Sequence, residues 1–159
     1  MKLTTRKLIK SILDTDTICN ELVITYKRHS KETPKIFDSK QIADYVRPLY
    51  SEIMEYREMC HVVSLNRNNQ IIGTYELSSL GRTSCVFDAT IIAQVAVMSN
   101  ANGIILVHNH PSGNLRWSDA DVAATKRARE ALKIFDIPVI DSLILTEESY
   151  TSLADSNVI

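Results

Sequence analysis

Residues 103–121 read GIILVHNHPSGNLRWSDAD, and this stretch carries the strongest structural signal in the chain. Its first five residues form a continuous apolar run, which is typical of a strand buried on both faces of a sheet. A polar turn follows, and Ser118 then supplies a side-chain oxygen of the kind that caps the start of a helix. The stretch therefore predicts a central strand, a turn, and a helix from about Asp119 to Phe135.

Working outward, the sequence predicts further strands and helices on both sides of this stretch. Before this stretch we expect a strand at residues 21–28 and a helix that starts at Asp38-Ser39 and is kinked or ended by Pro48. A hairpin follows, with one strand around Val62-Val63, a turn at 66–70 and a second strand at 71–77. We then expect a short strand at 85–87, a helix capped by Asp88 and ended by Asn102-Gly103, and, after the central helix, a strand at 137–145. Strands with interspersed helices indicate the α/β class, with a mixed sheet flanked by helices.

The composition sets broad limits on the function. A chain of 159 residues with 45% hydrophobic and 23% charged residues is typical of one globular domain. A formal net charge of -1 disfavours a strongly basic DNA-binding protein. No apolar run approaches about twenty residues, so we expect neither a signal peptide nor contact with a membrane. Cys19, Cys60 and Cys85 form no CxxC pair and are expected to be free thiols in a cytoplasmic protein.

The chemistry centres on His108, His110 and Asp121. Side chains two residues apart on a strand project from the same face, so both imidazoles can reach one metal ion. Asp121 falls in the first turn of the following helix, where its carboxylate can turn back toward them. Two nitrogens and one oxygen leave the fourth position of a zinc ion open for a catalytic water, and Ser118 can hydrogen-bond a developing oxyanion. The plainer interpretations are a metal-free histidine pair and a Ser-x-x-Asp helix cap.

At this point the sequence resembles a known family. His108-x-His110, seven residues, Ser118, two residues and Asp121 reproduce the H-x-H-x7-S-x2-D pattern of the JAMM (MPN+/JAB) metalloproteases, and HNHPSGN resembles the RadC-like branch, whose members carry a DNA-repair label. The flanks REMCHVVSLNRNNQIIGTYELS and SLADSNVI agree. The resemblance covers residues 21–159, which leaves 1–20 as an N-terminal extension without the helix-hairpin-helix region of longer RadC proteins.

The resemblance implies a fold and an activity. The fold is JAB/MPN-like (cytidine-deaminase-like), with three layers and a mixed β-sheet flanked by helices. The activity is that of a JAMM-type zinc metallopeptidase on peptide or isopeptide bonds, with Zn²⁺ held by His108, His110 and Asp121. The resemblance also assigns the general base to Glu58, which takes a proton from a zinc-bound water, while Glu55 and Glu52 remain nearby alternatives.

Several residues depart from the family pattern or carry less signal. Ser142 stands where the final strand of the family usually has histidine, and Trp117 stands where proline is frequent. Trp117 either lines a substrate groove or packs at the helix start. His61, on the first hairpin strand, is expected at the surface.

Two alternative functions stay open at this stage. A DNA repair-associated role follows from the RadC label, although the charge disfavours DNA as a partner. A non-catalytic zinc-containing module for protein interaction is the other. The expected partner of the enzyme is a protein or peptide substrate, and the sequence leaves its identity and the oligomeric state open.

Overall fold

The structure, a computed structural model, describes residues 33–78 and 87–156. In this part of the chain one mixed sheet has the strand order β2-β1-β3-β4-β5. Neighbouring strands are antiparallel except β3 and β4, which are parallel and are connected through helix α4. The strands are β1 (Cys60–Leu65), β2 (Ile71–Ser78), β3 (Gly103–Asn109), β4 (Val139–Leu145) and β5 (Tyr150–Ser152). The strand predicted at residues 21–28 lies outside the described residues, as do residues 85 and 86 of the strand predicted at 85–87.

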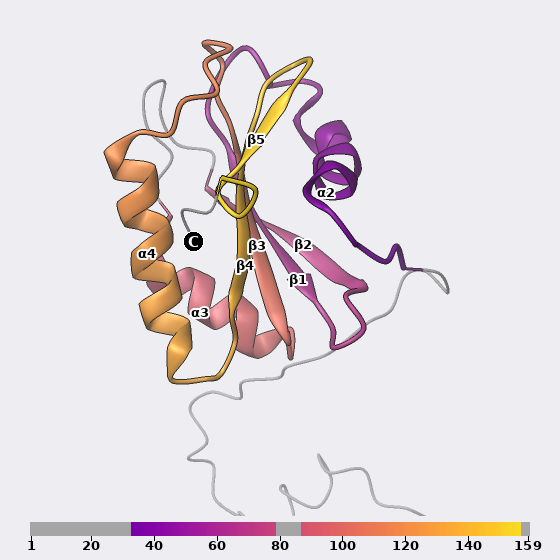
Figure 1. Cartoon of the computed structure of the whole chain (residues 1–159), viewed down its shortest axis with the longest axis vertical. Helices are drawn as coiled ribbons and strands as arrows, with labels where there is room; N and C mark the ends of the chain where they lie inside the picture. Colours follow the sequence, from indigo (N-terminus) through magenta and orange to yellow (C-terminus); the bar gives the residue numbers. More distant parts are fainter. Residues whose placement is uncertain (1–32, 79–86, 157–159) are drawn as a thin grey trace, which may run out of the picture.

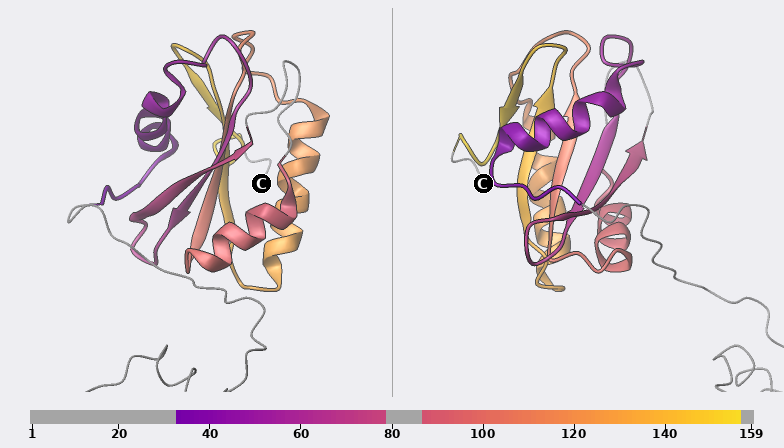
Figure 2. Two further views of the ribbon diagram at one scale, coloured as in Figure 1. Left: turned by 180° about the vertical axis from the view of Figure 1, so that it is seen from behind. Right: turned by 90° about the vertical axis from the view of Figure 1, so that its right-hand side faces the viewer.

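Helices cover both faces of this sheet. They are α2 (Ser39–Val46), which continues into the 3-10 helix η1 (Arg47–Tyr50), α3 (Ala89–Met98) and α4 (Asp119–Lys133). Figure 1 places α2 on one side of the sheet and α3 with α4 on the other, and Figure 2 shows the same three layers from behind and from the side. The predicted three-layer α/β arrangement is confirmed. No helix within the described residues is long and apolar enough to cross a membrane.

Helix α2 begins and ends where local chemistry dictates. The side chain of Asp38 accepts a hydrogen bond from the backbone N–H of Gln41 at 2.8 Å, which satisfies a donor that the first turn leaves unpaired. Pro48 lacks a backbone N–H, and the chain tightens from an α-helix to a 3-10 helix around it. Tyr50 at the end of η1 is fully buried, so this segment closes the core on its face of the sheet.

Strand β3 contributes to both cores, which explains its apolar sequence. Ile105 and Val107 pack on the side covered by α2, whereas Ile104 and Leu106 pack on the side covered by α3 and α4. Every residue of β3 is buried. Full burial of one such side chain stabilises the fold by about 1.5–3 kcal/mol relative to exposure, so the strand is fixed in place by its two faces together.

Three expectations need correction. Helix α3 ends at Met98, and the left-handed residue that ends it is Asn100 (φ 53) in place of Gly103, with the N–H of Ala101 bonded to the carbonyl of Ala96 at 3.0 Å. Gly103 instead begins β3, where a Cβ would come within 2.5 Å of Ile140 Cδ1. Helix α4 ends at Lys133, two residues before the predicted end at Phe135, and Phe135 is 50% exposed.

Cys60 also differs from the expectation. It was predicted to be a free thiol, but Cys60 is disulfide-bonded in the structure. The expectation that all three cysteines are thiols is therefore wrong.

Candidate metal centre

The two histidines lie where β3 leaves the sheet. His108 follows Ile104 and Leu106 on the face covered by α3 and α4, and its ring contacts that of Phe87 with centroids 5.4 Å apart. His110 comes directly after the strand, and its backbone N–H bonds to the carbonyl of Leu145 in β4 at 2.9 Å. Because side chains alternate along an extended chain, both rings lie on one side, and their Nε2 atoms are 3.1 Å apart.

Asp121 reaches the histidines from the third position of α4. Its Oδ2 accepts hydrogen bonds from the backbone N–H of Ser118 at 3.0 Å and from the Ser118 hydroxyl at 2.6 Å, and the Asp121 N–H donates to Ser118 Oγ at 3.1 Å. This capping box fixes the rotamer of the carboxylate. The other oxygen, Oδ1, lies 3.7 Å from His108 Nε2.

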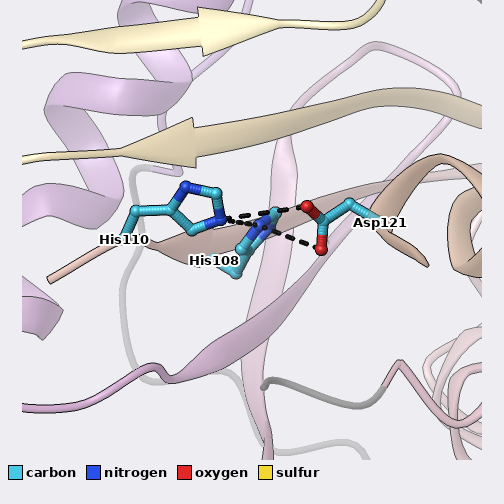
Figure 3. A group of neighbouring side chains, drawn as sticks. All are labelled: His108, His110 and Asp121. Atoms are coloured by element: carbon cyan, nitrogen blue, oxygen red, sulfur yellow. Dashed lines mark hydrogen bonds and ion pairs between the residues drawn. The ribbon is translucent and has the colours of Figure 1, made fainter. Parts of the chain in front are cut away.

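These three side chains converge with the spacing of metal ligands. Figure 3 shows the two rings and the carboxylate pointing toward one another. One ligand atom from each lies within 4.8 Å of the others. The closest approaches are 3.1 Å between the two Nε2 atoms, 3.7 Å from His108 Nε2 to Oδ1 and 3.9 Å from His110 Nε2 to Oδ2 of Asp121. Tetrahedral zinc with bonds of about 2.0–2.1 Å separates its ligand atoms by roughly 3.3 Å, so this donor set fits the ion.

The far nitrogen of His110 is held by the polar turn. His110 Nδ1 lies 2.6 Å from the carbonyl oxygen of Asn114, which can only accept, so Nδ1 carries the proton and Nε2 presents a lone pair. Gly113 (φ 73) donates its N–H to the His110 carbonyl at 3.0 Å and closes the turn. A backbone carbonyl on the second nitrogen is a frequent orienting partner of a metal-binding histidine. Sequence analysis missed Asn114, because a backbone carbonyl leaves no side-chain signal.

His108 is held in a dry, aromatic setting. Its side chain is 1% exposed, and the rings of Phe87 and Trp117 pack edge-on against it at 5.4 and 5.7 Å. Burial is the main cause that lowers the pKa of His108; the Asp121 carboxylate opposes the shift and His110 adds to it, and the net pKa is about 4. His108 is therefore neutral at pH 7, which is the protonation state that binds metals.

Glu58 lies in the segment that leads into β1, two residues before Cys60. In the antiparallel β1–β3 ladder Cys60 pairs with His108, and the N–H of Asn109 reaches the carbonyl of Met59 at 3.4 Å. Continued beyond the strands, this register predicts that position 58 lies across from His110 and on the face of Cys60 and His108. Glu58 is half-buried and is outside the cluster of three ligands. Its role as a base stays a prediction, as do the alternatives Glu55 and Glu52.

The structure also shows the contacts of three other residues that the sequence singled out, Ser118, Trp117 and Ser142. Ser118 caps α4 and orients Asp121, and its part in oxyanion binding stays a prediction. Trp117 packs against His108, so a packing role is present, and its indole N–H is buried without a hydrogen-bond partner among the described residues. Ser142 is fully buried and accepts a hydrogen bond from Thr125 of α4 at 3.3 Å.

His61 was expected at the surface, and that expectation is wrong. It is buried and packs against Tyr50 on the α2 face of the sheet, with ring centroids 5.0 Å apart. The hydrophobic cover of α2 and η1 reaches over this position, which periodicity within β1 alone does not reveal. His61 therefore lies across the sheet from His108.

Comparisons with known proteins find a matching family model and related sequences. The family model of the RadC-like JAB domain matches residues 36–158. Among curated proteins, a UPF0758 protein of Flavobacterium johnsoniae is 35% identical over 124 residues, which cover 78% of this chain and 53% of the relative. A UPF0758 protein of Salinibacter ruber is 35% identical over 133 residues, which cover 84% and 56%. The chain thus spans about half the length of these relatives.

Proposed function

Because this chain belongs to the RadC-like JAB domain family, we propose that it is a zinc-dependent hydrolase that cleaves peptide or isopeptide bonds. The observation that carries the proposal is the convergence of His108, His110 and Asp121, whose ligand atoms lie within 4.8 Å of one another. Three protein ligands are the number that catalytic zinc sites use, whereas structural sites use four.

The chemistry of the donor set favours zinc over harder cations. Two imidazole nitrogens and one carboxylate suit Zn²⁺, while Mg²⁺ and Ca²⁺ prefer oxygen ligands throughout. Zinc in this position supplies a Lewis acid that polarises a substrate carbonyl and lowers the pKa of water toward about 7. The side chains of the protein would orient the ligands, transfer the proton and bind the oxyanion.

The side chains around the site divide this work. His110 keeps its Nε2 lone pair on the site because Nδ1 donates to Asn114, and His108 stays neutral at pH 7 because it is buried. Glu58, two residues before the Cys60–His108 pair of the ladder, is the residue that we assign to accept the proton of the attacking water and to pass it to the leaving amine. Ser118, the exposed helix cap next to Asp121, is near enough to the ligands to donate to an oxyanion once its hydroxyl turns from Oδ2.

We expect a protein or peptide as the partner of this site. Amide hydrolysis uses a Lewis acid and a base, and a metal ion held by the three ligands, together with Glu58, would supply both. The formal net charge of -1 disfavours a strongly basic DNA-binding protein, which is why we place the hydrolase ahead of a DNA-repair role.

The metal content of the purified protein tests the proposal. We expect about one zinc per chain, as for a single site with three protein ligands. His108→Ala should lose it, because the most buried ligand is removed, whereas Glu58→Gln should keep it, because Glu58 is outside the ligand cluster. A screen of peptide and isopeptide substrates then compares the wild type with Glu58→Gln.

Two outcomes would count against the proposal. A wild-type protein that stays metal-free after incubation with Zn²⁺ contradicts the metal site. A zinc-loaded protein that cleaves no substrate in the screen, and whose Glu58→Gln variant behaves identically, favours the non-catalytic interaction module.

A further inference from the structure

Asn109 lies between the two histidine ligands but faces the other side of the sheet. It is the last residue of β3 and is completely buried. Its Nδ2 donates to the carbonyls of Met54 at 2.8 Å and Arg57 at 2.9 Å, and its Oδ1 accepts from the N–H of Met59 at 2.8 Å. Both donors and the acceptor of the amide are thus used on one short backbone segment.

That segment is the one that carries Glu58. Residues 54–59 connect η1 to β1 and lie outside both elements. The Arg57 carbonyl and the Met59 N–H belong to the peptide groups on either side of Glu58, so the amide of Asn109 holds the backbone before and after it. The N–H of Asn109 also reaches the Met59 carbonyl at 3.4 Å. Four hydrogen bonds therefore join the residue between the ligands to the backbone around Glu58.

The consequence is a direct mechanical link between the metal ligands and residue 58. His108 and His110 project to the α3–α4 face, and Asn109 projects from the same three-residue unit to the opposite face. Any shift of this unit moves the ligands and, through the Asn109 amide, the backbone of Glu58 together. Buried hydrogen bonds to three backbone groups leave little freedom for the segment, because each group would lose a buried hydrogen bond if the amide were removed.

We propose that Asn109 is a positioning residue that fixes the Glu58 carboxylate at the metal centre by clamping residues 54–59. This inference rests on the proposed function, in which Glu58 is the base. The Asn109 side chain faces away from the two histidine side chains, and it acts through Glu58. Its side chain therefore matters for the geometry of the base and not for the binding of the metal.

A matched control exists at the opposite end of β1. The Asn66 side chain accepts from the N–H groups of Asn68 and Gln70 at 2.8 and 3.0 Å and donates to Gln70 Oε1 at 3.1 Å. It makes three hydrogen bonds, as the Asn109 side chain does, but at the β1–β2 turn. Asn66→Ala therefore reports the general cost of losing such an amide away from the site.

The first arm of the test uses hydrogen exchange of the metal-free proteins, measured by mass spectrometry. In Asn109→Ala we expect peptides covering residues 54–59 to exchange faster by about tenfold, the size of roughly one net hydrogen bond. Peptides from α4 and β4 should keep their rates. Asn66→Ala should leave 54–59 unchanged. If Asn109→Ala does not fold, Asn109→Ser, which keeps one hydroxyl donor, takes its place.

The second arm replaces zinc with Co²⁺ and follows the visible absorption spectrum against pH. A carboxylate beside the ion changes the midpoint pH of the spectral change, so Glu58→Gln should shift it by about one unit, the size of a charge-assisted hydrogen bond. Asn109→Ala should shift it in the same direction, and the double variant should shift it no further than Glu58→Gln alone. Asn66→Ala should leave the midpoint in place, and all four variants should bind one Co²⁺.

Each outcome of the two experiments either supports or overturns the proposed role of Asn109. Local exchange at 54–59 together with a non-additive midpoint shift supports the clamp. Faster exchange throughout the sheet, or a midpoint shift in Asn109→Ala that adds in full to that of Glu58→Gln, overturns it, because Asn109 would then act without Glu58. If Glu58→Gln shifts the midpoint and Asn109→Ala does not, the clamp is wrong while the proposed base stands. If neither variant shifts it, both the clamp and the assignment of Glu58 fail.

Discussion

Ser118 and Asp121 bond each other reciprocally, and the pairing occupies only one oxygen of the carboxylate. Oδ2 accepts from the Ser118 N–H and hydroxyl, while Oδ1 remains on the side of His108 Nε2, 3.7 Å away. The hydrogen bonds between Ser118 and Asp121 thus cap helix α4 and at the same time orient the Asp121 carboxylate toward His108. The motif spacing of serine and aspartate serves the fold and the site together.

Ser118→Ala should therefore have two effects. Loss of the cap should lower the free energy of unfolding by about 1 kcal/mol. Loss of the hydroxyl, one of the two donors to Oδ2, should also weaken Zn²⁺ binding by about tenfold, because orienting groups of metal ligands have effects of this size. Chemical denaturation of the metal-free protein and competition with a chelator measure the two quantities.

Asp88→Ala supplies the control for this prediction. Asp88 caps α3 by accepting from the N–H groups of Thr90 and Ile91, at 2.8 and 3.4 Å, and contacts no ligand. It should lose similar stability with unchanged zinc affinity. Equal zinc affinities in the two variants would contradict a role of Ser118 at the site.

Gly113→Ala should weaken the site through the backbone. Gly113 has φ 73, a conformation that costs an L-residue about 1 kcal/mol, although a Cβ there meets no atom within 4 Å. The strain falls on the turn that brings the Asn114 carbonyl to His110, so we expect lower stability and weaker zinc binding. Gly73→Ala in β2 is the control, since it also has open space but no positive φ. A turn that tolerates alanine as well as position 73 does would refute this account.

Tyr50→Phe should destabilise the protein without changing the metal site. The buried hydroxyl of Tyr50 donates to the Val107 carbonyl at 3.0 Å. Its removal leaves a buried carbonyl without this partner, at a cost of about 1–3 kcal/mol in the free energy of unfolding. The measurement is urea denaturation at pH 7, with zinc content as a second readout. A variant as stable as the wild type would show that the carbonyl finds another partner.

Asp141 should give the stability a pH dependence of defined sign. Burial raises the pKa of its carboxyl group, against the hydrogen bonds it accepts from Ser152, Ala154 and Ser142. A raised pKa means that the folded state holds this proton more tightly than the unfolded state. The contribution of Asp141 is then fully present below its unfolded pKa, near 3.8, and is lost as the pH rises through its folded pKa.

Asp141→Asn isolates that contribution from the other carboxyl groups. We expect the stability of the wild type relative to Asp141→Asn to fall as the pH rises above the unfolded pKa of 3.8, measured by denaturation at matched ionic strength. A relative stability that rises with pH over the same interval would mean that the hydrogen bonds outweigh the burial of the charge.

Local patterns in the sequence are sufficient for much of the fold. The apolar run of β3 predicts a strand buried on both faces, and β3 is buried throughout. Asp38, Asp88 and Ser118 predict three helix starts, and each caps a helix. Helix ends were less predictable: the left-handed residue after α3 is Asn100, a residue type that tolerates this conformation, while Gly103 begins β3 next to the Ile140 side chain.

By itself, therefore, the sequence determined the central strand, the helix starts and the convergence of His108, His110 and Asp121. These features depend on residues that are close to one another in the sequence, so the spacing of the residues is sufficient to predict them. Only the tertiary structure decided that the Asn109 side chain bonds the backbone of residues 54–59, that His61 is buried against Tyr50, and that Cys60 pairs with His108 in the ladder that leads to Glu58. Those relationships join segments about fifty residues apart or lie between layers, and pairing at such separations leaves no periodic pattern in either segment.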